Sequence, residues 1–350
     1  MNVLIISSIS NDALDQIRSV DLRLRVIDAR GYYDQEIRET WPKMTINRYL
    51  DDSSKFKTPT LQERDRLLSK AEIILGGFPY PLDIRKRSPR LQWFHQTPAG
   101  ASNLIRGDLW GSNVIVTTSR GLGNVRAIAE YVLAGFFHFT RGLHMAYHDR
   151  QRHLFDHRKY NCISLEGKTV CIVGAGGIGT EVAKLCVGVG MRAVGTKRSI
   201  QSSTKQQKFF SRLEGPEKLC DLLSESDCVA ICCQWTPYTD RLFNSDIFAA
   251  VKPGAILVNV ARGEVIDEKA LIHALSQGRL RGVALDVYVG EFDHEPDPLL
   301  WDDERVVITP HVSNQTEKSQ HRGVELFCEN LRSYIEGSPL KNVVDWERGY

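Results

Sequence analysis

The sequence has no run of about 18 apolar residues, the length that a membrane-spanning helix needs. Its first residues, MNVLIISS, also lack the basic start and the long apolar core of a secretory signal peptide, and they predict a buried strand over residues 3–6. Neither sign of charge is in excess, because 45 Lys and Arg face 43 Asp and Glu, a net charge of +2. This near-neutral charge argues against nucleic acid or a membrane surface as a partner, because such partners usually require a basic face.

The sequence contains no C-x-x-C pair. The eight cysteines are scattered from Cys162 to Cys328, and several lie inside apolar runs. Disulfide scaffolds and zinc sites usually show closely spaced, patterned cysteines. We therefore expect reduced thiols, no metal site and a cytoplasmic location.

The length and the composition predict an ordinary globular protein with two domains. The chain has 350 residues, of which 42% are hydrophobic and 25% charged, and this exceeds what one hydrophobic core usually supports. Short apolar runs alternate with helical patterns, which predicts an α/β fold with doubly wound parallel sheets. The predicted strands are residues 3–6, 72–75, 91–94, 114–116, 169–173, 192–195, 228–233, 255–260, 283–287 and 306–308.

Helical patterns lie between several of these strands. Apolar spacing predicts helices over residues 125–144, 178–189 and 315–335, and Asp267 is the predicted N-cap of a further helix. The polar segment 31–59 has no clear periodicity and therefore predicts no element.

A glycine-rich turn connects one apolar strand to an amphipathic helix in the middle of the chain. Gly174, Gly176 and Gly179 form a G-x-G-x-x-G pattern in the context that a dinucleotide-binding motif requires. The first glycine permits a tight turn, the second lets a pyrophosphate approach, and the third lets helix and strand pack closely. The N–H groups around Gly177 and Ile178 would bind the phosphates. The alternative is a glycine-rich turn of the kind found in any α/β protein.

The segment about 20 residues beyond this motif indicates NADP(H) rather than NAD(H). NAD-binding folds place an acidic residue there to bind the ribose 2′-hydroxyl, but no acidic residue occurs between Glu181 and Glu214. The second strand of the motif instead ends in basic and hydroxyl residues, which suit a 2′-phosphate: Thr196, Lys197, Arg198 and Ser199. We predict that NADP(H) is preferred and that NAD(H) can bind. A solvated basic loop is the alternative.

Several motifs, in order along the chain, resemble the D-isomer-specific 2-hydroxyacid dehydrogenases, with glyoxylate and hydroxypyruvate reductases among them. The matching segments are AIAEYVLA (127–134), LEGKTVCIVGAGGIG (165–179), TPYTDRLF (236–243), LVNVARGEVIDEKAL (257–271), GVALDVY (282–288) and ITPHVS (308–313). The resemblance implies two Rossmann-like domains. A dinucleotide-binding domain over residues 119–312 would be inserted into a flavodoxin-like substrate domain of residues 1–118 and 313–350.

The resemblance also implies an activity, namely reduction of small 2-oxo acids of the glyoxylate and hydroxypyruvate class to D-2-hydroxy acids. It further implies a homodimer formed mostly by the central domain, for which helix 125–144 and loop 150–164, with Phe155 and Tyr160, are candidate interface elements. Transcriptional corepressors share this fold and sense dinucleotides. A binding protein with little turnover is therefore the alternative function.

The catalytic residues of the family fall on Arg262, Glu291 and His311. A planar arginine suits the carboxylate of a 2-oxo acid and polarises its carbonyl. A histidine can give a proton to the alkoxide as hydride arrives, and a carboxylate beside it favours the imidazolium. Glu295 is the alternative to Glu291 as that carboxylate.

Further contacts follow from the same resemblance. Asp286 corresponds to a family residue near the nicotinamide carboxamide, and the other expected cofactor contacts are Cys232, Thr239 and Val260. Two loops that follow N-terminal strands would join Arg262 in binding substrate, through Gly76, Gly77, Gly100 and Ala101.

The sequence departs from the family pattern at two places. Cys232-Cys233-Gln234-Trp235-Thr236 stands where the family usually has H-x-P-L-T, so the adenine side of the cofactor site should differ. Arg120 is unusual before the helix that begins near residue 125, and it would favour a substrate with an additional acidic group.

Overall fold

The computed structural model describes the chain except for residues 51–58, 121–123, 199–207, 317–318, 348 and 350. The described residues form two compact units. Unit 1 comprises Met1–Gly123 and Thr316–Tyr350, and unit 2 comprises Asn124–Gln315. The assignment of substrate to unit 1 and dinucleotide to unit 2 stays a prediction.

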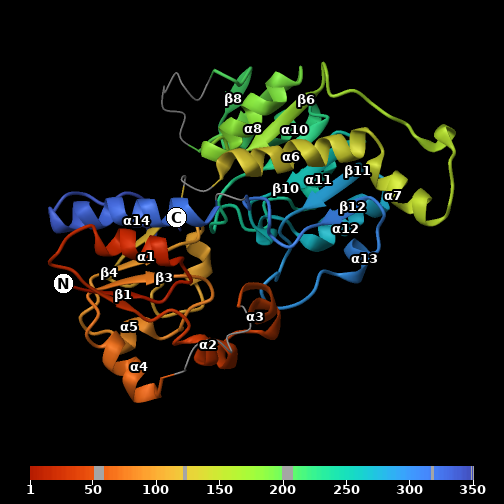
Figure 1. The fold of residues 1–350 in the computed structure, drawn as a ribbon. Coiled ribbons are helices and arrows are strands. Elements are labelled where there is room, and N and C mark those ends of the chain that lie inside the picture. The colour runs from red at the N-terminus through yellow and green to blue at the C-terminus, as the bar shows by residue number, and fades with distance from the viewer. Residues whose placement is uncertain (51–58, 121–123, 199–207, 317–318, 348, 350) are drawn as a thin grey trace. The chain divides into compact units, whose positions relative to one another are not determined.

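Unit 1 is built on a five-stranded parallel sheet with the order β2-β1-β3-β4-β5, which is the flavodoxin-like order (Figure 1). Successive side chains of a strand point to opposite faces, so Val3 and Ile5 pack under helices α1 and α14, whereas Leu4 packs with α2, α3, α4 and α5. The strands are β1 (Asn2–Ile5), β2 (Arg25–Asp28), β3 (Ile73–Gly76), β4 (Trp93–Gln96) and β5 (Ile115–Thr118). The helices are α1 (Asn11–Arg18), α2 (Asp34–Thr40), α3 (Lys43–Tyr49), α4 (Leu61–Leu68), α5 (Ile84–Arg87), η1 (Ala101–Leu104) and α14 (Ser319–Ile335).

Unit 2 is built on a seven-stranded parallel sheet with the order β12-β11-β10-β9-β6-β7-β8. The chain runs from β6 outward to β8 and then returns to β9 on the other side of β6. A reversal of strand order of this kind leaves a crevice at the carboxyl ends of the strands. The strands are β6 (Thr169–Val173), β7 (Arg192–Thr196), β8 (Arg212–Glu214), β9 (Cys228–Ile231), β10 (Ala255–Asn259), β11 (Leu280–Leu285) and β12 (Val306–Ile308).

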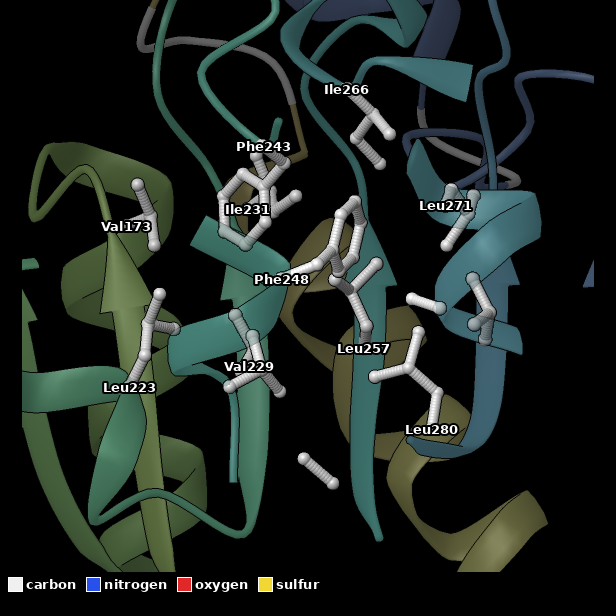
Figure 2. Packing of buried hydrophobic residues seen from close by; sticks show 14 of the residues in the cluster. Val173, Leu223, Val229, Ile231, Phe243, Phe248, Leu257, Ile266, Leu271 and Leu280 are labelled. Atoms are coloured by element: carbon white, nitrogen blue, oxygen red, sulfur yellow. The ribbon is translucent and has the colours of Figure 1, made fainter. Parts of the chain in front are cut away.

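Apolar helices cover both faces of this sheet. On one face, α10, α11 and α12 pack against the strands, and Figure 2 shows Phe243 and Phe248 among Val229, Ile231 and Leu257. On the other face lie α6 and α8. The helices of unit 2 are α6 (Val125–Thr140), α7 (Leu143–Gln151), η2 (His157–Lys159), α8 (Gly177–Gly188), η3 (Pro216–Lys218), α10 (Leu219–Ser224), α11 (Ser245–Ala250), η4 (Gly263–Val265), α12 (Glu268–Ser276) and α13 (Pro298–Trp301).

The structure confirms the predicted α/β class with two doubly wound sheets, and each predicted strand is present with its ends shifted by up to three residues. Strands β2 and β8 had escaped prediction because both are short, partly exposed edge strands without a continuous apolar run. Asp267 caps α12, as predicted, by accepting the N–H of Ala270 at 3.1 Å.

Three helix predictions need correction. The predicted helix 125–144 is two helices, since Gly142 adopts a left-handed conformation with φ of 69° and separates α6 from α7. Segment 31–59, for which no element was predicted, contains α2 and α3. Helix α14 begins at Ser319 rather than at residue 315.

No helix among the described residues is long and apolar enough to cross a bilayer. All eight cysteines are free thiols.

Candidate active site

Three neighbouring strands of unit 2 end at one edge of the sheet, and each is followed by a predicted site residue. Arg262 follows β10, Asp286 follows β11, and His311 follows β12. Because these strands are parallel, their carboxyl ends meet at the same edge, where open α/β sheets bind their ligands.

His311 and Glu291 form a direct pair. The Nδ1 atom of His311 lies 3.0 Å and 3.2 Å from the two carboxylate oxygens of Glu291. The Glu291 side chain is 2% exposed, whereas that of His311 is 22% exposed. The buried carboxylate therefore orients the ring, and Nε2 is left as the nitrogen that can transfer a proton. Glu291, and not Glu295, is the carboxylate that the structure brings to His311.

The loop that carries His311 is fixed by Asp286, which is only 1% exposed. One carboxylate oxygen of Asp286 accepts the hydroxyl of Thr309 at 2.7 Å and the N–H of Val312 at 2.8 Å. The other accepts the N–H of Ser313 at 2.9 Å. His311 itself has a positive φ of 56°, which costs a non-glycine residue about 1–3 kcal/mol and persists only when surrounding bonds impose it. The hydrogen bonds to Asp286 are those bonds.

The loop that carries Arg262 is shaped by the buried side chain of Asn259. Its amide donates to the backbone oxygen of Arg262 at 3.0 Å, and its carbonyl accepts the N–H of Ala261 at 3.0 Å. The next residue, Gly263, lies against the loop after β11, because a Cβ there would stand 2.0 Å from the carbonyl carbon of Tyr288. Only a glycine allows the Arg262 loop to pack this closely against the segment that leads to Glu291.

The glycine turn after β6 has a geometry that agrees with its spacing. Gly174 has a φ of 98°, and a Cβ on it would lie 2.6 Å from the Cα of Cys233. A Cβ on Gly179 would lie 2.3 Å from the backbone oxygen of Gly174, so helix and turn are in close contact. A Cβ on Gly176 or Gly177 would meet nothing within 4 Å. The protein thus leaves open space where α8 presents its first N–H groups, at Gly177 and Ile178.

The predicted 2′-phosphate residues lie at the end of β7. Thr196 is buried, and its backbone oxygen accepts the N–H groups of Gly174 and Ala175, which ties this strand end to the glycine turn. Lys197 and Arg198 follow directly, whereas Ser199 lies outside the described residues. The nearest acidic residue of the neighbouring strand, Glu214, pairs in register with Thr196, and its side chain lies 3.5 Å from the guanidinium of Arg212.

The other predicted cofactor contacts occupy the same edge of the sheet but make protein bonds of their own. The N–H of Cys232 donates to Val173 at 2.9 Å, and that of Val260 donates to Ile231 at 3.2 Å. The hydroxyl of Thr239 donates to the backbone oxygen of Gln234 at 2.6 Å and thereby closes the turn after β9.

The predicted substrate loops belong to unit 1. Gly76 ends β3, and a Cβ there would lie 2.3 Å from the ring of Phe94, so this glycine is required by packing. Gly77 lies beside Ser7. In the loop after β4, Gln96 donates its amide to the backbone oxygen of Gly100 at 2.9 Å, and Ala101 begins η1. Arg120 accepts, through its backbone oxygen, a hydrogen bond from the side chain of Asn342.

A family model for the NAD-binding domain of D-isomer specific 2-hydroxyacid dehydrogenases matches residues 133–313, more than half of the chain. The chain belongs to this family. The matched region contains the glycine turn, β10, β11, β12 and the His311 loop.

Individual relatives show the same relationship. The chain is 27% identical to the D-3-phosphoglycerate dehydrogenase of Methanocaldococcus jannaschii over 304 residues, which cover 85% of the chain but only 56% of that relative. It is 36% identical to the glyoxylate reductase of Pyrococcus furiosus over 187 residues, 52% of the chain and 53% of the relative. The chain thus spans little more than half the length of the first relative.

A solved structure shares the fold across the whole chain. It is the NADPH-dependent glyoxylate/hydroxypyruvate reductase of Sinorhizobium meliloti in complex with NADP and sulfate. The TM-score is 0.77 at 20% identity, and the match covers 100% of this chain and 99% of that one.

Members of this family bind a dinucleotide, and the glycine turn of this chain fits one. The open space beside Gly176 and Gly177, next to the first turn of α8, suits a pyrophosphate. Among the described residues, no group of three or more His, Cys, Asp or Glu side chains is arranged to hold a metal ion.

Sequence reasoning missed the residues that hold the site together. Asn259, Thr309 and Ser313 have no chemistry of their own, and their roles depend on contacts between loops that follow different strands. The available signal was that Asn259 lies in the segment 257–271, and Thr309 and Ser313 in the segment 308–313, both of which resemble the family.

The glycine turn generates a test by substitution. Gly176→Ala should change the free energy of unfolding by less than about 1 kcal/mol, because the added Cβ has no protein neighbour within 4 Å. It should weaken dinucleotide binding at least tenfold, or about 1.4 kcal/mol, because the methyl group fills the space for the pyrophosphate. Urea denaturation and nicotinamide fluorescence titration measure the two effects.

Gly188→Ala is the matched control, since Gly188 lies at the far end of the same helix and is also free of neighbours within 4 Å. It should leave dinucleotide affinity unchanged and should raise the free energy of unfolding by no more than about 1 kcal/mol. Equal dinucleotide affinity in the Gly176→Ala variant and the wild type would contradict the assignment of this turn.

Proposed function

We propose that this protein transfers hydride from NADPH to small 2-oxo acids of the glyoxylate and hydroxypyruvate class and thereby forms D-2-hydroxy acids. The observation that carries the proposal is the pair of His311 and Glu291, at 3.0 Å and 3.2 Å, at the sheet edge where Arg262 also lies. This is an acid, its orienting carboxylate and a planar cation at the ligand-binding edge of a dinucleotide fold.

The chemistry assigns one role to each side chain. The guanidinium of Arg262 binds the carboxylate of the substrate and polarises the carbonyl that is reduced. The bound nicotinamide supplies the hydride. His311, as the imidazolium, donates a proton from Nε2 to the developing alkoxide, and Glu291 stabilises that cation before transfer. In the reverse direction, neutral His311 accepts the hydroxyl proton.

We assign the dinucleotide to the glycine turn and the strand ends beside it. Gly174, Gly176, Gly177, Ile178 and Gly179 would surround the pyrophosphate, and Asp286, Cys232, Thr239 and Val260 remain proposed contacts elsewhere along the cofactor. For the substrate, we propose the backbone of Gly76, Gly77, Gly100 and Ala101 in unit 1 as carboxylate-binding elements.

We further propose a preference for NADPH. Lys197 and Arg198 follow β7, the strand whose end faces the ribose in this fold, and the carboxylate of Glu214 on the neighbouring strand lies 3.5 Å from the guanidinium of Arg212. A 2′-phosphate carries about two negative charges and would find two cations here.

A homodimer in the cytoplasm completes the proposal. Helix α7 and the segment after it expose several large apolar side chains, Leu143, Tyr147, Leu154 and Phe155, and the Phe155 side chain is fully exposed. Exposed apolar clusters of this kind mark protein interfaces.

Free thiols fit a reducing compartment. Cell fractionation would test the location, and recovery of the protein outside the cytoplasm would contradict it.

The activity is tested directly with purified protein, NADPH and a panel of 2-oxo acids that includes glyoxylate, hydroxypyruvate and its phosphate ester. Loss of absorbance at the reduced nicotinamide band is expected with at least one of them. His311→Gln should lower kcat by roughly 100- to 10,000-fold with a small effect on KM. Arg262→Ala should raise KM for the 2-oxo acid at least about tenfold and lower kcat as well.

Arg241→Ala, which removes an exposed arginine of the same unit, serves as the control and should retain both constants. NADPH binding without oxidation by any 2-oxo acid would overturn the enzymatic proposal in favour of a dinucleotide-sensing binding protein.

The proposed cofactor preference predicts that removal of the two cations lowers the affinity for NADPH but not for NADH. A variant with both Lys197→Ala and Arg198→Ala should bind NADPH at least roughly 100-fold more weakly, because two charge-assisted bonds contribute about 1.5–3 kcal/mol each, and should bind NADH with little change. Lys184→Ala removes an exposed cation of α8 and should alter neither affinity. Fluorescence titration measures each constant, and tighter binding of NADH than of NADPH by the wild type would refute the preference.

The dimer is tested at Phe155. Phe155→Asp places a charge in the exposed apolar cluster and should shift the protein from dimer to monomer in sedimentation velocity. Leu22→Asp, at a fully exposed position of unit 1, should remain dimeric. A monomeric wild type, or a dimeric Phe155→Asp variant, would contradict this interface.

A further inference from the structure

Helix α6 reaches the His311 loop through one polar contact. The hydroxyl of Tyr131, a half-buried residue of α6, lies 2.7 Å from the hydroxyl of Thr309, which directly follows β12. The rest of the Tyr131 ring packs among apolar side chains between α6 and the sheet. The packing sets where the ring lies, and the hydroxyl makes a separate contact with the loop.

The direction of this hydrogen bond follows from the second hydrogen bond of Thr309, which is to Asp286. Thr309 has a single hydroxyl proton, which it donates to the Asp286 carboxylate at 2.7 Å. That proton cannot serve a second acceptor at full strength, so Tyr131 must donate to the oxygen of Thr309. Donation from Tyr131 polarises the Thr309 hydroxyl and strengthens its bond to Asp286, because hydrogen bonds in a chain reinforce one another.

The Tyr131 phenol retains the proton that it donates to Thr309. Burial, together with the nearby Asp286 charge, outweighs the hydrogen bond with Thr309 and raises the pKa of the Tyr131 phenol to about 12. The tyrosine is therefore a neutral donor over the whole range in which an enzyme would be assayed.

This series of hydrogen bonds ends at Asp286, the residue that holds the loop of His311 in place. The oxygen of Asp286 that accepts the Thr309 hydroxyl also accepts the N–H of Val312, and the second oxygen accepts the N–H of Ser313. His311 lies between these anchoring points, with its own N–H bonded to the backbone oxygen of Asp286 at 2.9 Å and with a left-handed φ. A displacement of the Asp286 carboxylate would therefore move both ends of the loop that presents the imidazole.

We propose that Tyr131 is a positioning residue for His311, and that it acts through the directed hydrogen-bond chain Tyr131 to Thr309 to Asp286. The inference rests on the proposed function, since it deepens the role of His311 in that reaction. A purely structural tyrosine would contribute to the packing of α6 and would leave the His311 loop unaffected when only its hydroxyl is removed.

The test is Tyr131→Phe, which retains the ring and removes only the donor. In the proposed function, kcat should fall about 3- to 30-fold while KM for the 2-oxo acid and Kd for NADPH stay within twofold of the wild type. In amide hydrogen exchange, the segment that contains Val312 and Ser313 should exchange at least fivefold faster. Thr309→Val removes both hydroxyl bonds, and its combination with Tyr131→Phe should add little to either single effect.

Tyr33→Phe is the matched control. Tyr33 is a buried tyrosine of unit 1 whose hydroxyl donates to the backbone oxygen of Arg64 at 3.0 Å, so the same atom and one comparable hydrogen bond are removed. This variant should retain wild-type kcat and wild-type exchange in the His311 loop.

The two proposals fail in different ways. If the wild type reduces no 2-oxo acid, the proposed function fails, while the exchange comparison still decides whether Tyr131 controls the loop. Unchanged exchange over residues 312–313 in Tyr131→Phe, or an equal change in Tyr33→Phe, would overturn the role of Tyr131.

Discussion

The buried carboxylate of Asp286 is the constraint on which the candidate active site depends. It follows β11 in the sheet and accepts hydrogen bonds from Thr309, Val312 and Ser313, all of which belong to the loop after β12. A carboxylate that is 1% exposed requires such donors, because an unpaired buried charge is strongly destabilising. The requirement is met only when the loop folds over the carboxylate, and that fold gives His311 its left-handed backbone and directs its ring to Glu291.

The parallel sheet supplies the frame for this constraint. Parallel pairing brings the ends of β10, β11 and β12 to one edge, and the glycine turn after β6 ends at the same edge, on the other side of β9. Close approach of the loops completes the frame, since Gly263 lets the Arg262 loop lie against Tyr288, and Gly174 lets its turn lie against Cys233. The glycine turn, Arg262 and His311 are therefore all held at one edge of the same sheet.

Much of this arrangement could be predicted from local sequence. A glycine turn between strand and helix is a short-range pattern, as are the apolar strand runs, so the α/β fold was accessible without a structure. The choice of Arg262, Glu291 and His311 came instead from the resemblance of several ordered motifs to a known family. What escaped prediction depends on distant partners or weak local signals. Tyr131 and Thr309 are separated by 178 residues, and no local sequence pattern indicates that they are in contact. Edge strands β2 and β8 lacked apolar runs, and the left-handed Gly142 divided a helix whose apolar spacing is continuous.

The central claim is that the Asp286 carboxylate arranges the acid for catalysis, and the kcat of Asp286→Asn tests it most directly. The amide of asparagine has nearly the same shape, but its NH₂ group would face at least one of the backbone or hydroxyl donors that the carboxylate accepts, and the loop would have to shift. The account predicts that kcat with NADPH and the best 2-oxo acid falls at least about 30-fold, or about 2 kcal/mol. A kcat within twofold of the wild type would contradict it.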